Sequence, residues 1–259
     1  MQGNSSNPQR LDRKVALITG AAGGIGGATA RLFLSLGARL MLVDRDERAL
    51  AHIPADDDVA TSVADCADET AMEAAVGETL DRFGKIDILV ANAGIEGVLK
   101  PIDQLSSAEF ENVLRINVLG VWLAMRQAVP AMKAAGGGAI VALSSVAGTI
   151  GFPGMAAYTA SKHAVLGLVK VAALELAAAH IRVNAVAPGP VDNRMMQSLG
   201  DQLGGGDPSG FRTFIESRVP MGRYGTNEEI AQLVAFLASD AASYCTGGLY
   251  LGDGGYVAA

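Results

Sequence analysis

Cysteine is scarce in this sequence of 259 residues. Its two cysteines, Cys66 and Cys245, lie far apart, form no CxxC pair and lack the histidine spacing of a zinc site. The histidines, His52, His163 and His180, show no ligand spacing either, so we expect no bound metal. We interpret both cysteines as reduced, buried thiols, which favours a cytoplasmic location.

Positive charge and long apolar runs are also lacking. The net charge is -7 at pH 7 and there is no basic cluster, which argues against nucleic acid or an anionic membrane surface as a partner. No apolar run approaches the ~20 residues of a membrane span, and residues 1–10 lack the hydrophobic stretch of a signal peptide. We expect residues 1–10 to form a flexible tail.

Nothing in the sequence divides the chain into two domains. Single α/β domains often reach ~200–250 residues, and the chain has no internal repeat and no linker rich in proline, serine or charge. Half of the residues are apolar and only 18% are charged, which supplies enough apolar material for a large core. We therefore expect a single domain over residues 11–259.

Short apolar segments alternate with longer stretches that have helical spacing. The segments comprise residues 14–19, 38–43, 59–63, 86–90, 139–143, 181–186 and 247–251. Strands that alternate with helices predict βαβ units and a parallel sheet, and strands without polar alternation favour a sheet covered on both faces. The sequence thus predicts an α/β fold of the doubly wound Rossmann type, with a seven-stranded parallel sheet flanked by helices.

A glycine-rich turn follows the first predicted strand, and an amphipathic helix follows the turn. Gly20, Gly24, Ile25 and Gly26 lie where a backbone could approach a pyrophosphate closely at a helix N-terminus. Asp44 ends the second strand, near the ~20-residue offset at which a carboxylate binds ribose. These residues predict a dinucleotide site, although a glycine-rich turn without a ligand is the alternative.

The acid at Asp44 also predicts which dinucleotide binds. A carboxylate accepts hydrogen bonds from ribose hydroxyls and repels a 2′-phosphate, so NAD is favoured over NADP. Arg45 follows directly and would soften that preference if it faced the cofactor, but it can equally be a solvated surface charge.

Tyr158 and Lys162 are four residues apart, which places both on one face of a predicted helix. An ammonium group near a phenol lowers the phenol's pKa and would allow it to exchange a proton with a substrate oxygen. The alternative is that Tyr158 and Lys162 are residues without a catalytic role at the solvent-exposed edge of an amphipathic helix. Ser145 follows the strand at 139–143, where its hydroxyl could hold the substrate oxygen, although serines are also common turn formers.

The order of these motifs resembles the short-chain dehydrogenase/reductase family over residues 11–255. The motifs are TGAAGGIG (19–26), Asp65 after the third strand, NAG (92–94), Asn117 in RINVLG, SS (144–145), YTASK (158–162) and PGPV (188–191). The resemblance implies that Tyr158 is the proton donor or acceptor and that Ser145, rather than Ser144, orients the substrate oxygen. It also implies that Lys162 binds the nicotinamide ribose and that Asn117 holds a water of a proton relay, although Asn117 could merely cap or bend its helix.

The resemblance implies further contacts along the cofactor. Those on the adenosine side are Asp65, Cys66, Asn92, Ala93 and Gly94, and those beside the nicotinamide are Pro188, Gly189, Val191 and Asn193. Asn92 could instead be a brace between central strands. Asn193 stands where the family often has a threonine that contacts the carboxamide, and we expect the asparagine to keep that contact because its amide can donate and accept.

Residues 191–221 form the one stretch that reads as irregular, and we expect it to be a substrate lid. Glu96, Met155 and Met195 are predicted to contact the substrate together with Ser145 and Tyr158. Their mostly apolar character favours a small hydrophobic or cyclic alcohol or ketone.

The function hypothesis is an NAD-dependent alcohol dehydrogenase or ketone reductase. An NADPH-dependent 3-oxoacyl-(acyl carrier protein) reductase is the alternative, and a non-catalytic dinucleotide sensor is a third reading. The helix at about 109–135 and the helix that carries Tyr158 are apolar on more than one face. By resemblance they would form the contacts of a homotetramer, with residues 252–259 near a second interface.

Overall fold

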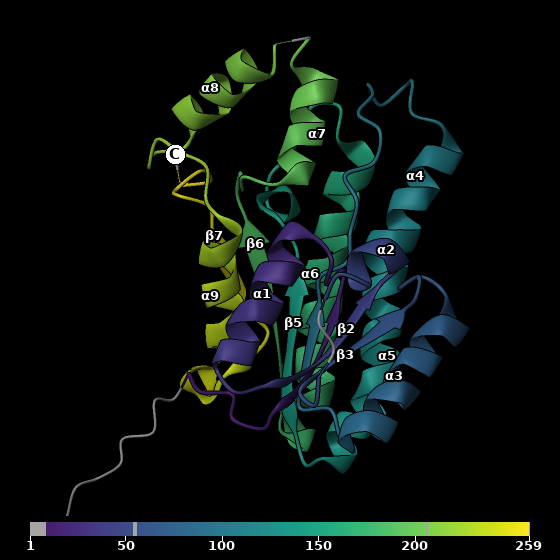
Figure 1. Ribbon diagram of the computed structural model, residues 1–259. Coiled ribbons are helices and arrows are strands. Elements are labelled where there is room, and N and C mark those ends of the chain that lie inside the picture. The colour runs from purple at the N-terminus through teal and green to yellow at the C-terminus, as the bar shows by residue number, and fades with distance from the viewer. Residues whose placement is uncertain (1–8, 54–55, 206, 259) are drawn as a thin grey trace, which may run out of the picture.

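The computed structural model describes residues 9–53, 56–205 and 207–258 (Figure 1). Of the tail expected at residues 1–10, residues 1–8 therefore lie outside the described part. No helix in the described part is long and apolar enough to cross a membrane.

The predicted seven-stranded parallel sheet is confirmed, with strand ends within two residues of those expected. Its spatial order is β3-β2-β1-β4-β5-β6-β7, and every neighbouring pair is parallel. The strands are β1 (Val15–Thr19), β2 (Arg39–Asp44), β3 (Val59–Val63), β4 (Ile88–Ala91), β5 (Gly138–Leu143), β6 (Ile181–Pro188) and β7 (Leu249–Gly252). The order reverses between β1 and β4, and ligands of such sheets bind at the carboxyl ends beside that point.

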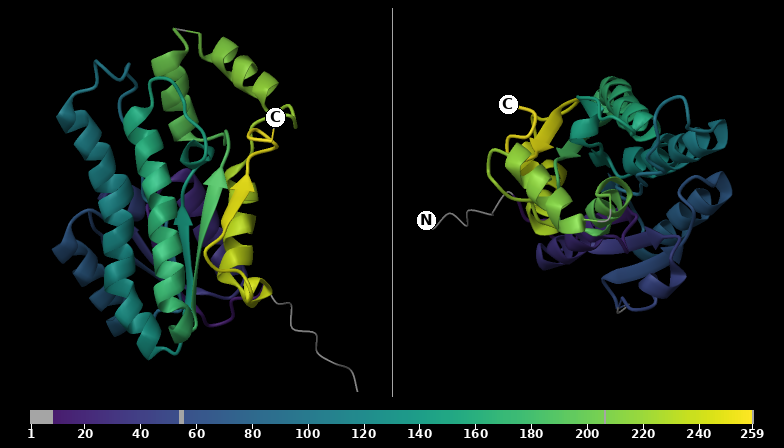
Figure 2. Two further views of the ribbon diagram at one scale, coloured as in Figure 1. Left: turned by 180° about the vertical axis from the view of Figure 1, so that it is seen from behind. Right: turned by 90° about the horizontal axis from the view of Figure 1, so that it is seen from above.

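Helices cover both faces of the sheet (Figures 1 and 2). They are α1 (Gly24–Ser35), α2 (Glu47–Leu50), α3 (Glu69–Phe83), α4 (Ser107–Leu114), α5 (Gly120–Ala134), α6 (Ala156–Leu176), α7 (Arg194–Leu203), α8 (Pro208–Arg218) and α9 (Asn227–Ala238). A π-helical turn, Arg115–Leu119, joins α4 to α5, so the helix expected at about 109–135 is continuous but locally wider, with i→i+5 hydrogen bonds.

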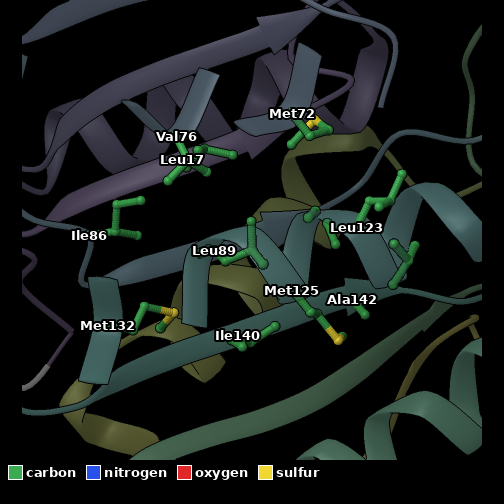
Figure 3. Close-up of a cluster of buried hydrophobic side chains, with 14 of the residues drawn as sticks. Leu17, Met72, Val76, Ile86, Leu89, Leu123, Met125, Met132, Ile140 and Ala142 are labelled. Carbon is green, nitrogen blue, oxygen red and sulfur yellow. The ribbon is translucent and has the colours of Figure 1, made fainter. Parts of the chain in front are cut away.

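Two apolar cores lie on opposite faces of the sheet, and β1 contributes to both. Val15 and Leu17 belong to one core together with residues of α3, α5 and α6, and Figure 3 shows Leu17 in this core. Ala16 and Ile18 pack against α1 and α9 on the other face. Successive strand residues point to opposite faces, so a strand covered on both sides must be apolar throughout.

The expectation of a long irregular segment at 191–221 is wrong, because α7 and α8 occupy most of it. Asn193 caps α7 by accepting a hydrogen bond from Met196 N at 3.2 Å, and Asp207 caps α8 through Gly210 N at 2.9 Å. Gly204, Gly205 and Asp207 lie between the two helices. Figure 1 shows both helices above the carboxyl ends of the strands.

The expectation that both cysteines are buried holds for Cys66 but is wrong for Cys245, which is half-buried. Cys66 lies under α5, where burial raises the pKa of its thiol to about 11 and keeps it protonated. Cys245 precedes β7. This strand lies at the edge of the sheet and is itself only partly buried, so the residues beside it are partly exposed.

Candidate active site

A cavity of about 1460 Å³ lies at the carboxyl ends of the strands, beneath α7 and α8. Every predicted site residue lines it except Gly26 and Asn117. The structure thus brings together residues that are spread from Gly20 to Asn193 in the sequence. Within the described part, no cluster of His, Cys, Asp or Glu could hold a metal ion.

The glycine-rich turn opens onto this cavity at the N-terminus of α1. Gly20 has φ +65°, and a Cβ there would lie 2.8 Å from the Cα of Ala93. The amide of Asn92 donates to the carbonyls of Thr19, at 3.0 Å, and Gly20, at 2.9 Å. Asn92 therefore ties β4 to the turn, as the bracing interpretation predicted, and both of its donor hydrogens serve that purpose.

Asp44 is fixed at the rim of the turn by backbone donors. One carboxylate oxygen accepts from Ala22 N at 3.0 Å and the other from Asp46 N at 3.0 Å. Arg45 beside it is exposed and also lines the cavity.

Asp65 and Cys66 continue this wall after β3. Burial of Asp65 would raise its pKa, but hydrogen bonds from Ala67 N and from Arg115, at 3.0 Å, lower it overall. The carboxylate is therefore held in its charged form at the predicted adenosine end.

Tyr158 and Lys162 lie one turn apart on α6, both buried at the cavity wall. The Lys162 ammonium donates to the carbonyl of Leu143 at 2.8 Å and lies 5.6 Å from the centre of the Tyr158 ring. The interpretation of this pair as surface residues is therefore wrong, because α6 packs the pair against the end of β5.

The expected lowering of the Tyr158 pKa is not found in the protein alone. Burial raises the pKa of Tyr158 to about 12, the Ser145 side chain lowers it in part, and the Glu96 carboxylate raises it further. Burial also lowers the pKa of Lys162 to about 8. Loss of hydration thus has more effect on this phenol than the nearby amine does.

The two serines after β5 have different surroundings. The Ser144 hydroxyl is buried and donates to the Lys162 carbonyl at 3.0 Å, which ties β5 to α6. The Ser145 hydroxyl faces Tyr158 at the cavity wall and accepts from Ala147 N at 3.1 Å. Only Ser145 is placed to reach a substrate oxygen beside Tyr158.

Asn117 lies behind the cavity, fully buried in the π-helical turn. Its amide oxygen accepts from Ile95 N at 2.8 Å, and its nitrogen donates to Ile95 O at 2.9 Å and Ser161 Oγ at 3.0 Å. These bonds join the loop after β4 to α6. They use both donor hydrogens of the side-chain amide and one lone pair of its oxygen, and the predicted contact of Asn117 with a relay water stays a prediction.

The loop after β6 forms the predicted nicotinamide end. Gly189 N donates to Gly252 O at 3.0 Å, and a Cβ on Gly189 would lie 2.7 Å from the Cα of Asp253. Besides capping α7, the amide of Asn193 donates to Asn227 at 3.3 Å. These bonds leave one donor hydrogen and one lone pair of the amide, and the predicted carboxamide contact stays a prediction.

Apolar side chains surround Tyr158 at the other end of the cavity. Met195 Sδ lies 3.8 Å from the Tyr158 hydroxyl oxygen. Met155 packs beside Tyr158, and Leu99, Phe152 and Leu199 complete this cluster.

Among the cavity residues that were not predicted are Gln202 of α7 and Tyr256 near the C-terminus. Gln202 accepts from Leu99 N at 3.0 Å, and the Tyr256 ring lies 6.1 Å from that of Phe152. Both contacts join distant parts of the chain, and no local spacing marks either residue.

Comparisons with known proteins agree with this arrangement. Residues 20–257 match the family model described as enoyl-(acyl carrier protein) reductase. Levodione reductase of Leifsonia aquatica is 39% identical over 269 residues, which cover 100% of both chains. A crystal structure of levodione reductase matches with a TM-score of 0.93 over 96% of this chain and 100% of that chain.

Two further relatives differ in the reaction that their names state. The cis-4-hydroxycyclohexanecarboxylate dehydrogenase of Sinomonas cyclohexanicum is 40% identical and covers 95% of this chain and 97% of its own length. The 3-oxoacyl-(acyl carrier protein) reductase of Thermotoga maritima is 39% identical, with coverages of 96% and 99%. Overall identity therefore does not separate the two activities.

Proposed function

This chain belongs to the short-chain dehydrogenase/reductase family, and on that premise we propose that it uses NAD to interconvert a small cyclic secondary alcohol and its ketone. The chain is an oxidoreductase of this family that acts on alcohols or ketones with a nicotinamide dinucleotide. The hypothesis of a non-catalytic dinucleotide sensor is therefore rejected. The choice of NAD, the substrate and the residue roles are the proposal.

The residues present fit a dinucleotide. The backbone at Gly20 and Gly26 leaves no room for a Cβ, and the N-terminus of α1 offers backbone N–H groups and a partial positive charge toward a pyrophosphate. The observation that carries the choice of NAD is the fixed carboxylate of Asp44. It would accept from ribose hydroxyls and repel a 2′-phosphate.

A bound nicotinamide ring supplies the hydride acceptor for an alcohol or the hydride donor for a ketone. In oxidation, the Tyr158 phenolate takes the proton from the substrate hydroxyl, and in reduction the phenol returns it. Ser145 donates a hydrogen bond that holds the substrate oxygen beside Tyr158. Lys162, fixed by Leu143 O, stabilises the phenolate and is placed to reach the nicotinamide ribose.

The substrate proposal depends on the apolar cluster around Tyr158 and on the relatives. Met155 and Met195 give flexible apolar walls that suit a compact ring, and one relative is named for a hydroxylated cyclohexane ring. We include residues 191–221 in the proposal as the lid over this end of the cavity. We also propose a cytoplasmic homotetramer.

A 3-oxoacyl-(acyl carrier protein) reductase that uses NADPH is the second candidate, because a relative of equal identity carries that name. Such an enzyme would need to accept the 2′-phosphate of NADPH. Asp44 opposes this, so tighter binding of NADPH than of NADH would favour the second candidate, while oxidation of a cyclic alcohol would favour the first.

The test is to measure NADH and NADPH binding by nicotinamide fluorescence, together with oxidation of cyclohexanol. We expect NADH to bind roughly 100-fold more tightly than NADPH. Asp44→Ser should reduce that ratio, whereas Asp81→Ser, which removes an exposed carboxylate on α3, should not. Tyr158→Phe should keep NADH binding and lose ~10³-fold in turnover. Tighter binding of NADPH by the wild type would reject the NAD assignment and favour the reductase.

A further inference from the structure

Glu96 is a buried acid whose carboxylate forms no hydrogen bond within the described part of the chain. It is 9% exposed and lines the cavity. Arg194 Nη1 of α7 forms a long ion pair with Glu96 Oε1 at 3.7 Å, without a hydrogen bond, and the Arg194 side chain is 74% exposed. Because Glu96 lines the cavity and accepts no hydrogen bond from the described part of the chain, its carboxylate oxygens remain available to a donor on a bound molecule.

The backbone on both sides of Glu96 is fixed. Asn117 holds the N–H and the carbonyl of Ile95, and Gln202 donates to Gly97 O at 3.4 Å and accepts from Leu99 N at 3.0 Å. Gly97 has φ +76°, and a Cβ there would lie 2.4 Å from Val113 Cγ2. The loop therefore cannot easily turn the Glu96 carboxylate out toward solvent.

The carboxylate is also close enough to the reacting position to interact with it. Its charge contributes to the raised pKa of Tyr158, after burial. Tyr158 and Glu96 thus face the same apolar space, which Met155, Met195 and Leu99 complete. A ring whose reacting hydroxyl lies at Tyr158 would present another of its substituents to Glu96.

Building on the function proposed above, we propose that Glu96 determines specificity by accepting a hydrogen bond from a second hydroxyl group of the substrate. The preferred substrate class is a neutral cyclic diol or hydroxyketone. A donor on the substrate satisfies the carboxylate, whereas a methyl group leaves it without hydrogen bonds and a substrate carboxylate places two negative charges together. By this proposal the chain disfavours a hydroxycyclohexanecarboxylate, the kind of substrate for which one relative is named.

The test compares three substrates of similar shape, with kcat/KM measured in the presence of NAD. They are cyclohexane-1,4-diol, 4-methylcyclohexanol and 4-hydroxycyclohexanecarboxylate. We expect the wild type to favour the diol by ~10–100-fold over each of the other two, beyond the factor of two that its second reactive hydroxyl contributes. Glu96→Met should abolish the preference over 4-methylcyclohexanol. Glu96→Gln should raise kcat/KM for the carboxylate by ~tenfold or more.

Glu78→Gln removes a carboxylate from the exposed side of α3 and serves as the matched control. NADH binding by each variant shows that it is folded. Equal use of the diol and 4-methylcyclohexanol by the wild type overturns the Glu96 assignment and leaves the proposed function standing. A preference for the carboxylate that is lost in Arg194→Ala overturns it in favour of Arg194. Failure to oxidise any cyclic alcohol rejects the proposed function and this inference together.

Discussion

Burial changes the pKa values of Tyr158 and Lys162 in opposite directions. Removal from water disfavours the charged form of each group, so the phenol's pKa rises to about 12 and the ammonium's falls to about 8. In the free protein this pair therefore approaches its neutral state near pH 8. A ketone that binds beside Tyr158 therefore meets a protonated phenol, which can donate its proton as reduction requires. Oxidation requires the phenol to lose that proton first.

The lowered pKa of Lys162 makes a prediction for stability. Between pH 8 and about 10 the unfolded chain still binds the Lys162 proton while the folded protein has released it, so stability rises with pH. Over this window the wild type should gain on the order of 2 kcal/mol relative to Lys162→Met. Urea unfolding at several pH values measures the difference.

Tyr158 acts in the opposite sense only above about pH 10, where the unfolded chain loses the phenol proton first, so the window is kept below that value. Lys170→Met, on the exposed face of α6, controls for the loss of a lysine from the same helix. Parallel stability curves for wild type and Lys162→Met would show that Lys162 stays charged when buried.

At the scale of elements, the turn between β1 and α1 depends on a close approach of backbone to backbone. A Cβ on Gly26 would lie 2.2 Å from Gly20 O and 2.7 Å from Asn92 Nδ2. Gly27, one residue further along α1, would place its Cβ 3.4 Å from Ala21 O, which is an ordinary contact. The two neighbouring glycines thus have different roles.

Gly26→Ala should therefore destabilise the protein by ~1–3 kcal/mol and weaken NADH binding, since the turn must move away from the added methyl group. Gly27→Ala should be neutral or stabilising by ~0.5–1 kcal/mol, because alanine favours a helix more than glycine does. Urea midpoints and NADH titrations of both variants test this pair. Equal effects at the two positions would contradict the assigned geometry.

At the scale of the whole molecule, large apolar side chains remain exposed on one helical face. Leu174 is 83% exposed and Val171 54% exposed on α6, and Trp122 is 42% exposed on α5. α4 and the π-helical turn pack beside α6 on the same side of the sheet (Figure 2). An exposed apolar face of this kind supports the proposed association of copies through these helices.

We expect wild-type protein to run as a tetramer in light scattering, and Leu174→Glu to shift it to a smaller species. Burying a leucine contributes ~1.5–3 kcal/mol, so replacing it by a charge should weaken association by tenfold or more. Ile102→Glu, also 83% exposed but in the loop before α4, is the control and should leave the mass unchanged. A wild-type mass equal to one chain would reject the tetramer.

The sequence by itself determined the sheet, the glycine-rich turn and the family. These depend on spacing along the chain, such as apolar segments between helical stretches, glycines directly after β1, and Tyr158 four residues before Lys162. A strand end also determines where a side chain lies, because the carboxyl ends of parallel strands meet at one edge of the sheet. Asp44 and Ser145 were predicted to lie at this edge in this way, Gly189 was predicted by the family resemblance, and all three line the cavity.

Only the tertiary structure decided what these side chains contact. Asn92 and Asn117 proved to be tied to Gly20 and Ile95, and Gln202 was found to anchor the loop that carries Glu96. The sign of the Tyr158 pKa shift arises from burial, and the position of Glu96 in the cavity wall arises from the packing of its loop. Burial depends on residues that are distant in the chain and packed together, so no local pattern encodes it.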